Sequence, residues 1–260
     1  MYELCKDICA QMSPIGLSEM KGIRLMNRLD TKYLFPTSEL PKLLMDLKQG
    51  FRVQVVEGKC ISPYSTLYYD TDDLQMYIRH HDQHRVRQKI RTRAYMDSNL
   101  CFIEVKRKNN KGRTSKKRTE IPMNCMMNVL ECDEAVAFME LHSDFVRQDI
   151  QPTLQTQFDR ITLVNALKTE RLTIDLNLSF TNIQTGNQRQ LPELAIIELK
   201  QDGKQRSLVQ EHLSDYRIRP GGISKYCLGT VLTNEWVKKN LFKKKIRYIQ
   251  KLTSTHHDFT

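Results

Sequence analysis

The chain has 260 residues and a formal net charge of +11 at pH 7, with 41 lysines and arginines against 30 aspartates and glutamates. This length suits one large domain, or one domain with a helical appendage. The charge indicates an anionic partner, which nucleic acid, a phosphate compound or a membrane surface could supply. The seven cysteines include no CxxC pair, the first ten residues carry charges, and no apolar window approaches about 18 residues. These features exclude a zinc site of the usual spacing, a signal peptide and a membrane span, and they predict a soluble cytoplasmic protein with reduced thiols.

The N-terminal half alternates predicted helices with predicted strands. Residues 1–27 have the pattern of a helical lead-in, with Gly16 and Gly22 as breaks. The first strand is predicted over about 28–35, and a helix with a Ser/Thr cap and a leucine stripe follows and ends at Gly50. The next predicted elements are strands near 51–56 and 65–71, a helix beginning at 71–73, and two strands joined by a turn at 97–99.

The C-terminal half continues with one long helical pattern and three more strands. Residues 122–148 are predicted to be helical, and we interpret the cluster at Met126 and Met127 as core packing rather than a cofactor site. A turn is predicted at 185–187. The remaining predicted elements are strands near 153–163, 170–180 and 193–200, a helix over 203–216 and a basic helix over 234–252.

Two local motifs lack the residues that would complete them. His80 and His84 lie one helical turn apart, as a metal pair would, but an HExxH signature would need a glutamate at position 81. Gly221 and Gly222 precede a serine and a lysine, yet the GxxxxGK[ST] loop occurs nowhere in the chain. We therefore interpret the histidines as a solvated helix end and reject a P-loop ATPase.

One pattern recurs along the chain, in short segments that alternate charged and apolar residues. Lys89, Arg91 and Arg93 stand at every second position, and only a β-strand places them on one face. The amphipathic helices need a sheet surface, so we expect apolar strand faces to point outward under helices and charged faces to line a wide lumen. Since unpaired buried charge is costly, such a lumen must hold water and a polyanion. The same alternation occurs at 28–33, 102–108, 158–162, 171–176 and 196–200.

Taken in order, these segments resemble one family. The motifs are Arg28-x3-Lys32-Tyr33, Tyr69-Asp70-Thr71, Lys89-x-Arg91-x-Arg93, Glu104-x-Lys106-x-Lys108, Arg160, Arg171-x-Thr173-x-Asp175, Glu198-x-Lys200 and Ser224-Lys225-Tyr226. Over about residues 20–230 the chain resembles the catalytic VTC domain of the vacuolar transporter chaperone polyphosphate polymerases, which are triphosphate tunnel metalloenzymes. The resemblance implies an α+β fold: an antiparallel eight-stranded β-barrel tunnel with a charged lumen and helices on the outside. The expected parts are a lead-in at 1–27, the tunnel domain at 28–230 and a basic C-terminal helix and tail at 231–260.

The resemblance also implies roles for individual residues. Glu198 would hold a divalent metal, Mn²⁺ or Mg²⁺, and Ser224 would donate to a phosphate. Family members often carry a basic residue where this chain has Gly222, which puts one phosphate contact in question, and the SPX and transmembrane segments of eukaryotic polymerases do not occur in this sequence. The expected catalytic residues are Lys32, Arg91, Arg93, Lys106, Arg160, Arg171 and Lys200, and the expected substrate-binding residues are Arg28, Lys89, Lys108, Arg118, Ser224 and Lys225.

The function implied by the resemblance is transfer of the γ-phosphoryl group of ATP, or another nucleoside triphosphate, onto phosphate or polyphosphate. Lysines, arginines and one metal can position and stabilise such a transfer without a covalent protein nucleophile. We expect ATP, polyphosphate and pyrophosphate or phosphate as partners. The basic C-terminal helix could contact an acidic membrane or a membrane protein, but we prefer the interpretation that its cations form a solvated outer face.

Three alternatives stay open at this stage. A tunnel triphosphatase would activate water, and that branch usually carries ExExK where this chain has Arg28-x-Asp30-x-Lys32. A non-catalytic polyanion-binding module would need only the cations. Nucleic-acid binding is the weakest alternative, because aromatic residues are not interleaved with the basic strands as a stacking surface requires.

Overall fold

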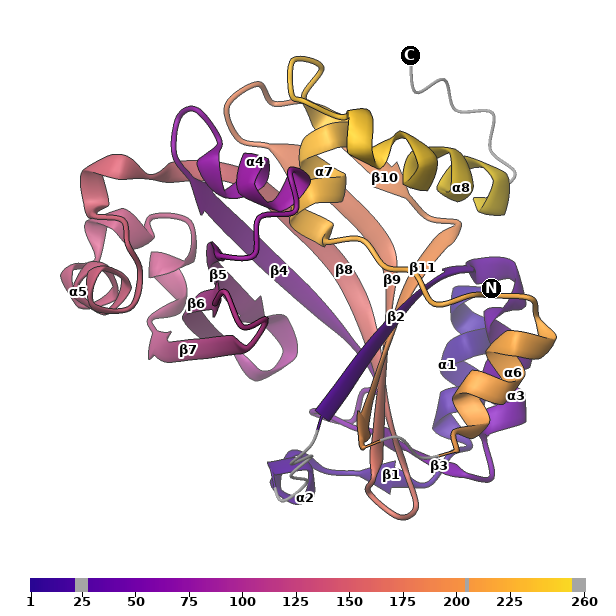
Figure 1. The fold of residues 1–260 in the computed structure, drawn as a ribbon. Helices are drawn as coiled ribbons and strands as arrows, with labels where there is room; N and C mark the ends of the chain where they lie inside the picture. Colours follow the sequence, from indigo (N-terminus) through magenta and orange to yellow (C-terminus); the bar gives the residue numbers. More distant parts are fainter. Residues whose placement is uncertain (22–27, 204–205, 254–260) are drawn as a thin grey trace.

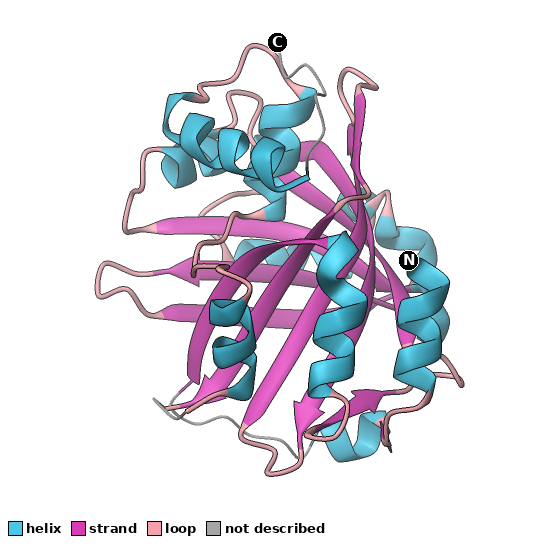
Figure 2. Ribbon diagram, turned by 90° about the vertical axis from the view of Figure 1, so that its right-hand side faces the viewer, coloured by secondary structure: helices cyan, strands magenta, loops and turns pink. Residues whose placement is uncertain are grey.

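A computed structural model describes residues 1–21, 28–203 and 206–253, with Lys21 and Arg28 described by their backbone alone. Its centre is one strongly curved sheet, and helices lie around this sheet on several sides (Figure 1, Figure 2). The fold therefore combines a large antiparallel sheet with peripheral helices, as expected for an α+β tunnel protein.

Eight antiparallel strands form the main path of the sheet, which confirms the predicted strand number. In spatial order they are β2 (Arg28–Pro36), β11 (Leu194–Asp202), β9 (Glu170–Asn182), β8 (Gln151–Asn165), β4 (Ile61–Asp70), β5 (Arg87–Tyr95), β6 (Leu100–Lys108) and β7 (Thr114–Ile121). Within the described residues β2 and β7 do not pair with each other, so the tunnel wall is not strictly closed at this edge.

Three short strands extend this sheet at its margins. They are β1 (Pro14–Ile15), β3 (Phe51–Gln54) and β10 (Gln188–Leu191). β1 pairs in parallel with β3, β3 pairs with β8, and β10 pairs with β9. Neither β1 nor β10 was predicted, since both are too short to show an alternating pattern. The turn expected at 185–187 precedes β10, and Gly186 has a positive φ of 73° there.

Most apolar strand faces point outward beneath helices, as predicted. Ile90, Ile103 and Val105 pack under α5 (Asp133–His142) in one buried cluster. The outer faces of β2, β9 and β11 pack under α1 (Tyr2–Ala10), α3 (Leu40–Leu47) and α6 (Leu208–Asp215) in another. A short helix, α2 (Leu17–Lys21), follows β1. The charged faces of the same strands consequently line the concave side.

At one end of the concave side, helices also pack against inward-facing strand residues. Leu34 and Ile196 share strand faces with Lys32 and Glu198, yet they pack against α7 (Lys225–Thr233) and α8 (Lys243–Thr253). Gly229 permits the close approach of α7, because a Cβ there would lie 2.5 Å from the Phe180 ring. Beside α7 lies α4 (Gln75–His81), so helices cover part of the sheet at that end (Figure 1).

Several helix predictions need correction. The pattern over 122–148 forms only α5 among short 3₁₀ turns at Met123–Met126, Val129–Glu131 and Arg147–Asp149, since asparagines at 124 and 128 favour turns over helix interiors. The basic helix begins at Lys243 rather than 234, because the Asn234 side chain accepts a hydrogen bond from the Trp236 amide at 3.0 Å and forms a turn. The lead-in at 1–27 is two helices separated by β1, and Gly22 lies outside the described residues.

Candidate functional site

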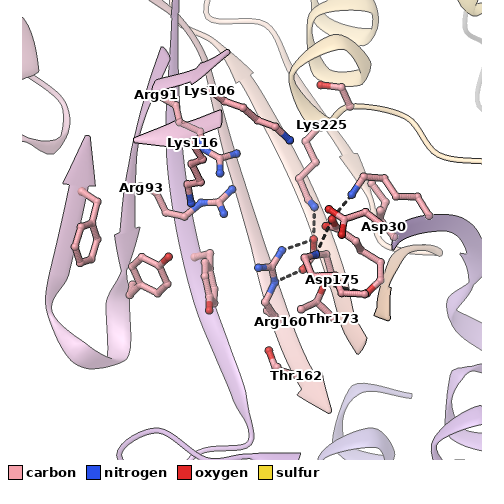
Figure 3. Close-up of a pocket in the computed structure, with 18 of the residues that line it drawn as sticks. Asp30, Arg91, Arg93, Lys106, Lys116, Arg160, Thr162, Thr173, Asp175 and Lys225 are labelled. Carbon is pink, nitrogen blue, oxygen red and sulfur yellow. Dashed lines mark hydrogen bonds and ion pairs between the residues drawn. The ribbon is translucent and has the colours of Figure 1, made fainter. Parts of the chain in front are cut away.

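The concave side of the sheet encloses a cavity of about 1300 Å³. Figure 3 shows Arg91, Arg93, Lys106 and Lys116 pointing in from one wall toward Arg160, Asp175 and Lys225 on the other. Among the described residues, thirteen lysines and arginines line it against five carboxylates, so the cavity is strongly positive. The cations are Lys32, Arg87, Lys89, Arg91, Arg93, Lys106, Lys108, Lys116, Arg118, Arg160, Arg171, Lys200 and Lys225, and the carboxylates are Asp30, Asp97, Glu120, Asp175 and Glu198.

The sequence-predicted site residues lie together in this cavity. Every one of them lines it except Arg28, whose side chain lies outside the structural description. They come from seven strands and from the N-terminus of α7, so the fold brings distant segments to one place. Arg87, Lys116 and Asp175 also line it, and Glu104 contacts two of the lining cations, although the prediction did not assign these four residues roles. The alternation that places Arg118 on an inward face also places Lys116 there, so that residue could have been found.

Three carboxylates each bridge two cations, and we call these groups the ion triads. In the first triad, Glu198 contacts the amines of Lys32 at 2.7 Å and Lys200 at 2.6 Å. Lys32 and Glu198 stand directly opposite each other on β2 and β11. The two oxygens of this carboxylate are therefore held by separate lysines.

The other two triads repeat this arrangement on neighbouring strands. Glu104 contacts Arg91 at 2.6 Å and Lys116 at 2.5 Å, and its side chain is only 1% exposed. Asp175 contacts Arg160 through two hydrogen bonds of 2.5 and 2.8 Å, and the Lys225 amine reaches the same carboxylate. In each triad burial alone would raise the pKa of the carboxyl group, but the paired cations outweigh burial and hold that pKa well below its usual range.

Each triad keeps an excess of one positive charge, and among the described residues no carboxylate lies within ion-pair distance of Arg93 or Lys106. Arg93 donates to the Thr66 hydroxyl at 3.1 Å and lies over the rings of Tyr64 and Phe158. Lys106 forms no ion pair within the described part of the chain. Burial lowers the pKa of four lysines from the ordinary 10.5 to about 8, with neighbouring cations adding to the effect: Lys89, Lys116, Lys200 and Lys225. The cavity thus holds more positive charge than its own carboxylates neutralise.

The N-terminus of α7 faces the same cavity. Ser224 caps this helix by accepting a hydrogen bond from the Cys227 amide at 3.4 Å, and the Lys89 amine donates to the Ser224 hydroxyl at 2.5 Å. Helix N-termini favour anions because their first amides are unsatisfied and the helix dipole is positive there. Gly222 fits its position only as glycine, since a Cβ would lie 2.4 Å from the Lys32 Cβ. The basic residue that the resemblance implies at this position would therefore clash with Lys32.

Two family motifs meet beneath α7 in a structural role. The Asp70 carboxylate accepts backbone hydrogen bonds from Thr71 at 2.8 Å, Met76 at 2.8 Å and Tyr77 at 2.9 Å, and it also accepts the Tyr226 hydroxyl. Asp70 is fully buried. This carboxylate therefore caps α4 and ties α7 to the end of β4, which positions Ser224 and Lys225 at the cavity.

The histidine pair does not form. His84 lies beyond the end of α4 on the surface, whereas His80 lines the cavity. Burial, together with Lys89 and Arg87, lowers the pKa of His80 to about 2, so this imidazole is neutral. The prediction of a solvated helix end is correct for His84 and wrong for His80.

The carboxylates in the cavity can be tested as metal ligands. Within the described residues no three His, Cys, Asp or Glu side chains gather closely enough to hold a metal ion. Of the triad carboxylates, Glu198 is the most accessible, with its side chain 22% exposed against 1% for Glu104 and 4% for Asp175. Mg²⁺ commonly uses one or two carboxylates together with substrate phosphates. Glu198 therefore fits a metal whose other ligands are phosphate oxygens and water, provided that one of the two lysines releases a carboxylate oxygen of Glu198.

Comparison with solved structures supports the same fold. A protein described as a "putative adenylate cyclase" from Bacillus halodurans has a TM-score of 0.51 at 15% identity, covering 76% of this chain and 96% of its own. A "putative adenylyl cyclase" from Hippeastrum, described as having a dominant triphosphatase activity, has a TM-score of 0.50 at 14% identity, covering 77% of this chain and 94% of its own. At such identities these similarities establish the tunnel fold alone.

Sequence comparison establishes the family. A search of the curated proteins found no match. In the described residues, every helix is too short or too polar to cross a bilayer. The family model of the VTC domain matches residues 27–234, which contain all of the cavity cations named above. The chain therefore belongs to the VTC domain family.

Proposed function

We propose that the protein is a polyphosphate polymerase-like phosphotransferase that moves the γ-phosphoryl group of a nucleoside triphosphate, such as ATP, onto phosphate or polyphosphate. The observation that carries this proposal is the uncompensated positive charge along the cavity. Each ion triad retains one net positive charge, and Arg93 and Lys106 add more. A linear polyanion is the ligand class that suits this charge, and membership in the VTC family supports it.

Phosphoryl transfer needs positioned positive charge more than it needs a protein nucleophile. In the proposed reaction an ionised acceptor oxygen bonds to the γ-phosphorus as the bond to the bridging β–γ oxygen breaks, and the nucleoside diphosphate leaves. Because the acceptor is already ionised, no strong general base is required. We assign charge stabilisation to Lys32, Arg91, Arg93, Lys106, Arg160, Arg171 and Lys200, and substrate binding to Arg28, Lys89, Lys108, Arg118, Ser224 and Lys225.

Glu198 is the proposed ligand for Mn²⁺ or Mg²⁺. When bound, such a metal would neutralise charge on the triphosphate oxygens. The chain's own residues hold Glu198 in place for this role, since the amines of Lys32 and Lys200 each contact one of its carboxylate oxygens. Both lysines also lie beside the proposed path of the phosphate chain. Lys32 is the more exposed of the two lysines, so we expect it to transfer its contact from Glu198 to a phosphate.

Hydrolysis is the second candidate reaction. The observation that favours it is the likeness to the Hippeastrum protein, whose description names a triphosphatase activity. A third candidate, a polyanion-binding module without catalysis, would use the same cations. Incubation of the purified protein with ATP and Mn²⁺, followed by separation of products by chain length, distinguishes the three. Long phosphate chains are expected, free phosphate alone would support hydrolysis, and no product would support the binding module.

We also propose a cytoplasmic location and a contact between the C-terminal segment and an anionic lipid surface. Trp236 is 93% exposed and lies shortly before α8. The exposed cations Lys243, Lys244 and Arg247 follow it along the chain. An exposed tryptophan followed along the chain by several exposed cations suits the boundary between lipid headgroups and water. The seven cysteines are all free, as a reducing compartment requires.

A further inference from the structure

Two cysteines that are distant in the sequence meet on the outer side of the sheet. Cys9 lies in α1, and Cys60 follows the turn between β3 and β4. Cys9 is fully buried, whereas Cys60 is partly exposed. Both pack in the apolar cluster beneath α1 and α3, and neither is among the residues that line the cavity. The pair is therefore separate from the candidate functional site.

The geometry of α1 places the two sulfur atoms together. The Cys60 thiol donates a hydrogen bond to the Lys6 backbone carbonyl, with 3.8 Å between the sulfur and the oxygen. In a helix such a carbonyl lies beside the side chain of the residue three positions later, which here is Cys9. The two thiols are accordingly hydrogen-bonded to each other. One sulfur is thus accessible from solvent, and the other is buried next to it.

The surroundings of Cys60 favour its thiolate form. The hydrogen bond from Cys9, together with the nearby Lys6 ammonium, outweighs burial and lowers the pKa of Cys60 to about 7. Tyr2 also lies near Cys60, but burial raises the pKa of its hydroxyl, so this side chain stays neutral. The thiolate is the reactive form of cysteine, and a free cysteine has a pKa of about 8.5. Cys60 therefore has a larger reactive fraction at neutral pH than an ordinary cysteine.

Other cysteines of the chain do not share this environment. Burial raises the pKa of Cys5, which lies one helical turn before Cys9. Cys125 is also hydrogen-bonded to a second thiol, that of Cys132, but burial, this hydrogen bond and the Glu134 carboxylate raise its pKa. A neighbouring thiol alone therefore does not activate a cysteine in this protein, and Cys125 provides an internal comparison.

We propose that Cys60 and Cys9 form a peroxide-sensitive disulfide site that joins α1 to the start of β4. The Cys60 thiolate attacks one oxygen of hydrogen peroxide, the O–O bond breaks and hydroxide leaves, which gives a sulfenic acid on Cys60. The Cys9 thiol then loses its proton and attacks the Cys60 sulfur, the S–O bond breaks, and the S–S bond forms with release of water. Peroxide is thus reduced as the two thiols are oxidised. This inference does not depend on the proposed function.

Peptide mapping of the full chain tests the site directly. The protein is treated with hydrogen peroxide, the remaining thiols are blocked with iodoacetamide, and the tryptic peptides are identified by mass spectrometry without reduction. The expected product joins peptide 7–21 to peptide 60–79, each of which contains one cysteine. Free peptide 60–79 after treatment, its linkage to peptide 1–6, or equal oxidation of Cys125 and Cys60 would overturn the proposal. This map of the wild-type protein decides the question even where a variant fails to fold.

Three variants separate the roles of the two thiols. Cys60→Ser should abolish the cross-link, and Cys9→Ser should leave a sulfenic acid on Cys60 that a cyclic 1,3-diketone traps. Cys125→Ser is the matched control and should give as much cross-link as the wild-type protein. A cross-link of the same yield in Cys60→Ser, or no trapped sulfenic acid in Cys9→Ser, would contradict the assigned order of steps and overturn the proposal.

Thermal melts give an independent readout of the bond between α1 and β4. The disulfide would close a loop of about fifty residues, so the oxidised protein should melt about 5–15 °C above the reduced protein. Dithiothreitol should reverse this rise, Cys125→Ser should show it, and Cys60→Ser should not. Equal melting temperatures for oxidised and reduced wild-type protein would show that the site does not fasten α1 to the strand, and would overturn the proposal.

Discussion

Replacement of Glu104 by glutamine tests whether the ion triads make a cation-lined cavity compatible with folding. The change keeps the size of the side chain and removes the charge that Arg91 and Lys116 share. Glu104 is 1% exposed, so its loss leaves two cations without their partner in a buried setting. Removal of one member of a buried ion pair costs about 3–5 kcal/mol. For a chain of this size that corresponds to a fall in Tm of roughly 6–20 °C.

The same variant should respond more strongly to a polyanion than the wild-type protein. A ligand at about 100 times its Kd stabilises the folded state by roughly 2.7 kcal/mol. Glu104→Gln removes a negative charge from the binding surface, so its Kd for tripolyphosphate should fall, and each tenfold decrease adds about 1.4 kcal/mol at the same concentration. Tripolyphosphate is therefore expected to recover part of the lost stability.

Thermal melts with and without tripolyphosphate measure both effects, with Glu211→Gln as the control. Glu211 pairs with Arg206 on the surface, so its replacement should change the melting temperature little. Equal melting temperatures for Glu104→Gln and wild type, with equal shifts on adding ligand, would show that the triads do not neutralise the cavity. A loss of stability with no larger ligand response would show that Glu104 serves the fold and not the binding surface.

Four further predictions follow from the same geometry. Lys106→Met should raise the melting temperature of the ligand-free protein, because Lys106 lies near the cations Lys89 and Arg91 and is repelled by them. The same variant should bind tripolyphosphate more weakly. A fall in both the melting temperature and the affinity would contradict this reasoning. The affinity for tripolyphosphate, measured by calorimetry, should fall as the pH rises from about 7 to about 9.5. Four cavity lysines have a pKa of about 8, so they are cationic below pH 8 and neutral above it. An affinity that does not change with pH would exclude these lysines as ligands. Glu198→Gln should retain polyphosphate binding but lose ATP turnover with Mn²⁺ by about a hundredfold or more, and equal product from both proteins would remove the metal assignment. Trp236→Ala should reduce sedimentation with vesicles containing anionic lipid, and wild-type protein that ignores such vesicles would reject the lipid contact.

The inward face of each strand could be predicted from the sequence because the period of two is a local property. Lys89, Arg91 and Arg93 must share a face in any strand, whichever strands lie beside it. The same reasoning identified the cations of β2, β6 and β11. The partners of these cations could not be predicted so easily, because Lys32 meets Glu198 only when β2 pairs with β11 in one particular register. Pairing between segments so distant in sequence depends on the whole sheet.

Local sequence patterns also could not predict where the sheet ends or which of its inward residues a helix covers. Alternation of charged and apolar residues predicts a strand but does not say whether the last strand meets the first, so the open edge between β2 and β7 was missed. The inward packing of α7 was missed for a related reason. Leu34 continues the inward face of Lys32, and a single apolar residue at the end of a strand does not reveal that a helix covers it.

Strand register couples the fold to the proposed site. Each ion triad contains one pair of residues that stand directly opposite each other on neighbouring strands: Lys32 with Glu198, Arg91 with Glu104, and Arg160 with Asp175. A slip of one residue in any of these ladders would move the charges to the outer face and the apolar residues into the cavity. Cross-strand ion pairs favour the correct register, while the apolar residues between them are buried only in that register. The forces that assemble this sheet are thus the forces that place the cations, and anion binding needs no rearrangement of the backbone to collect them.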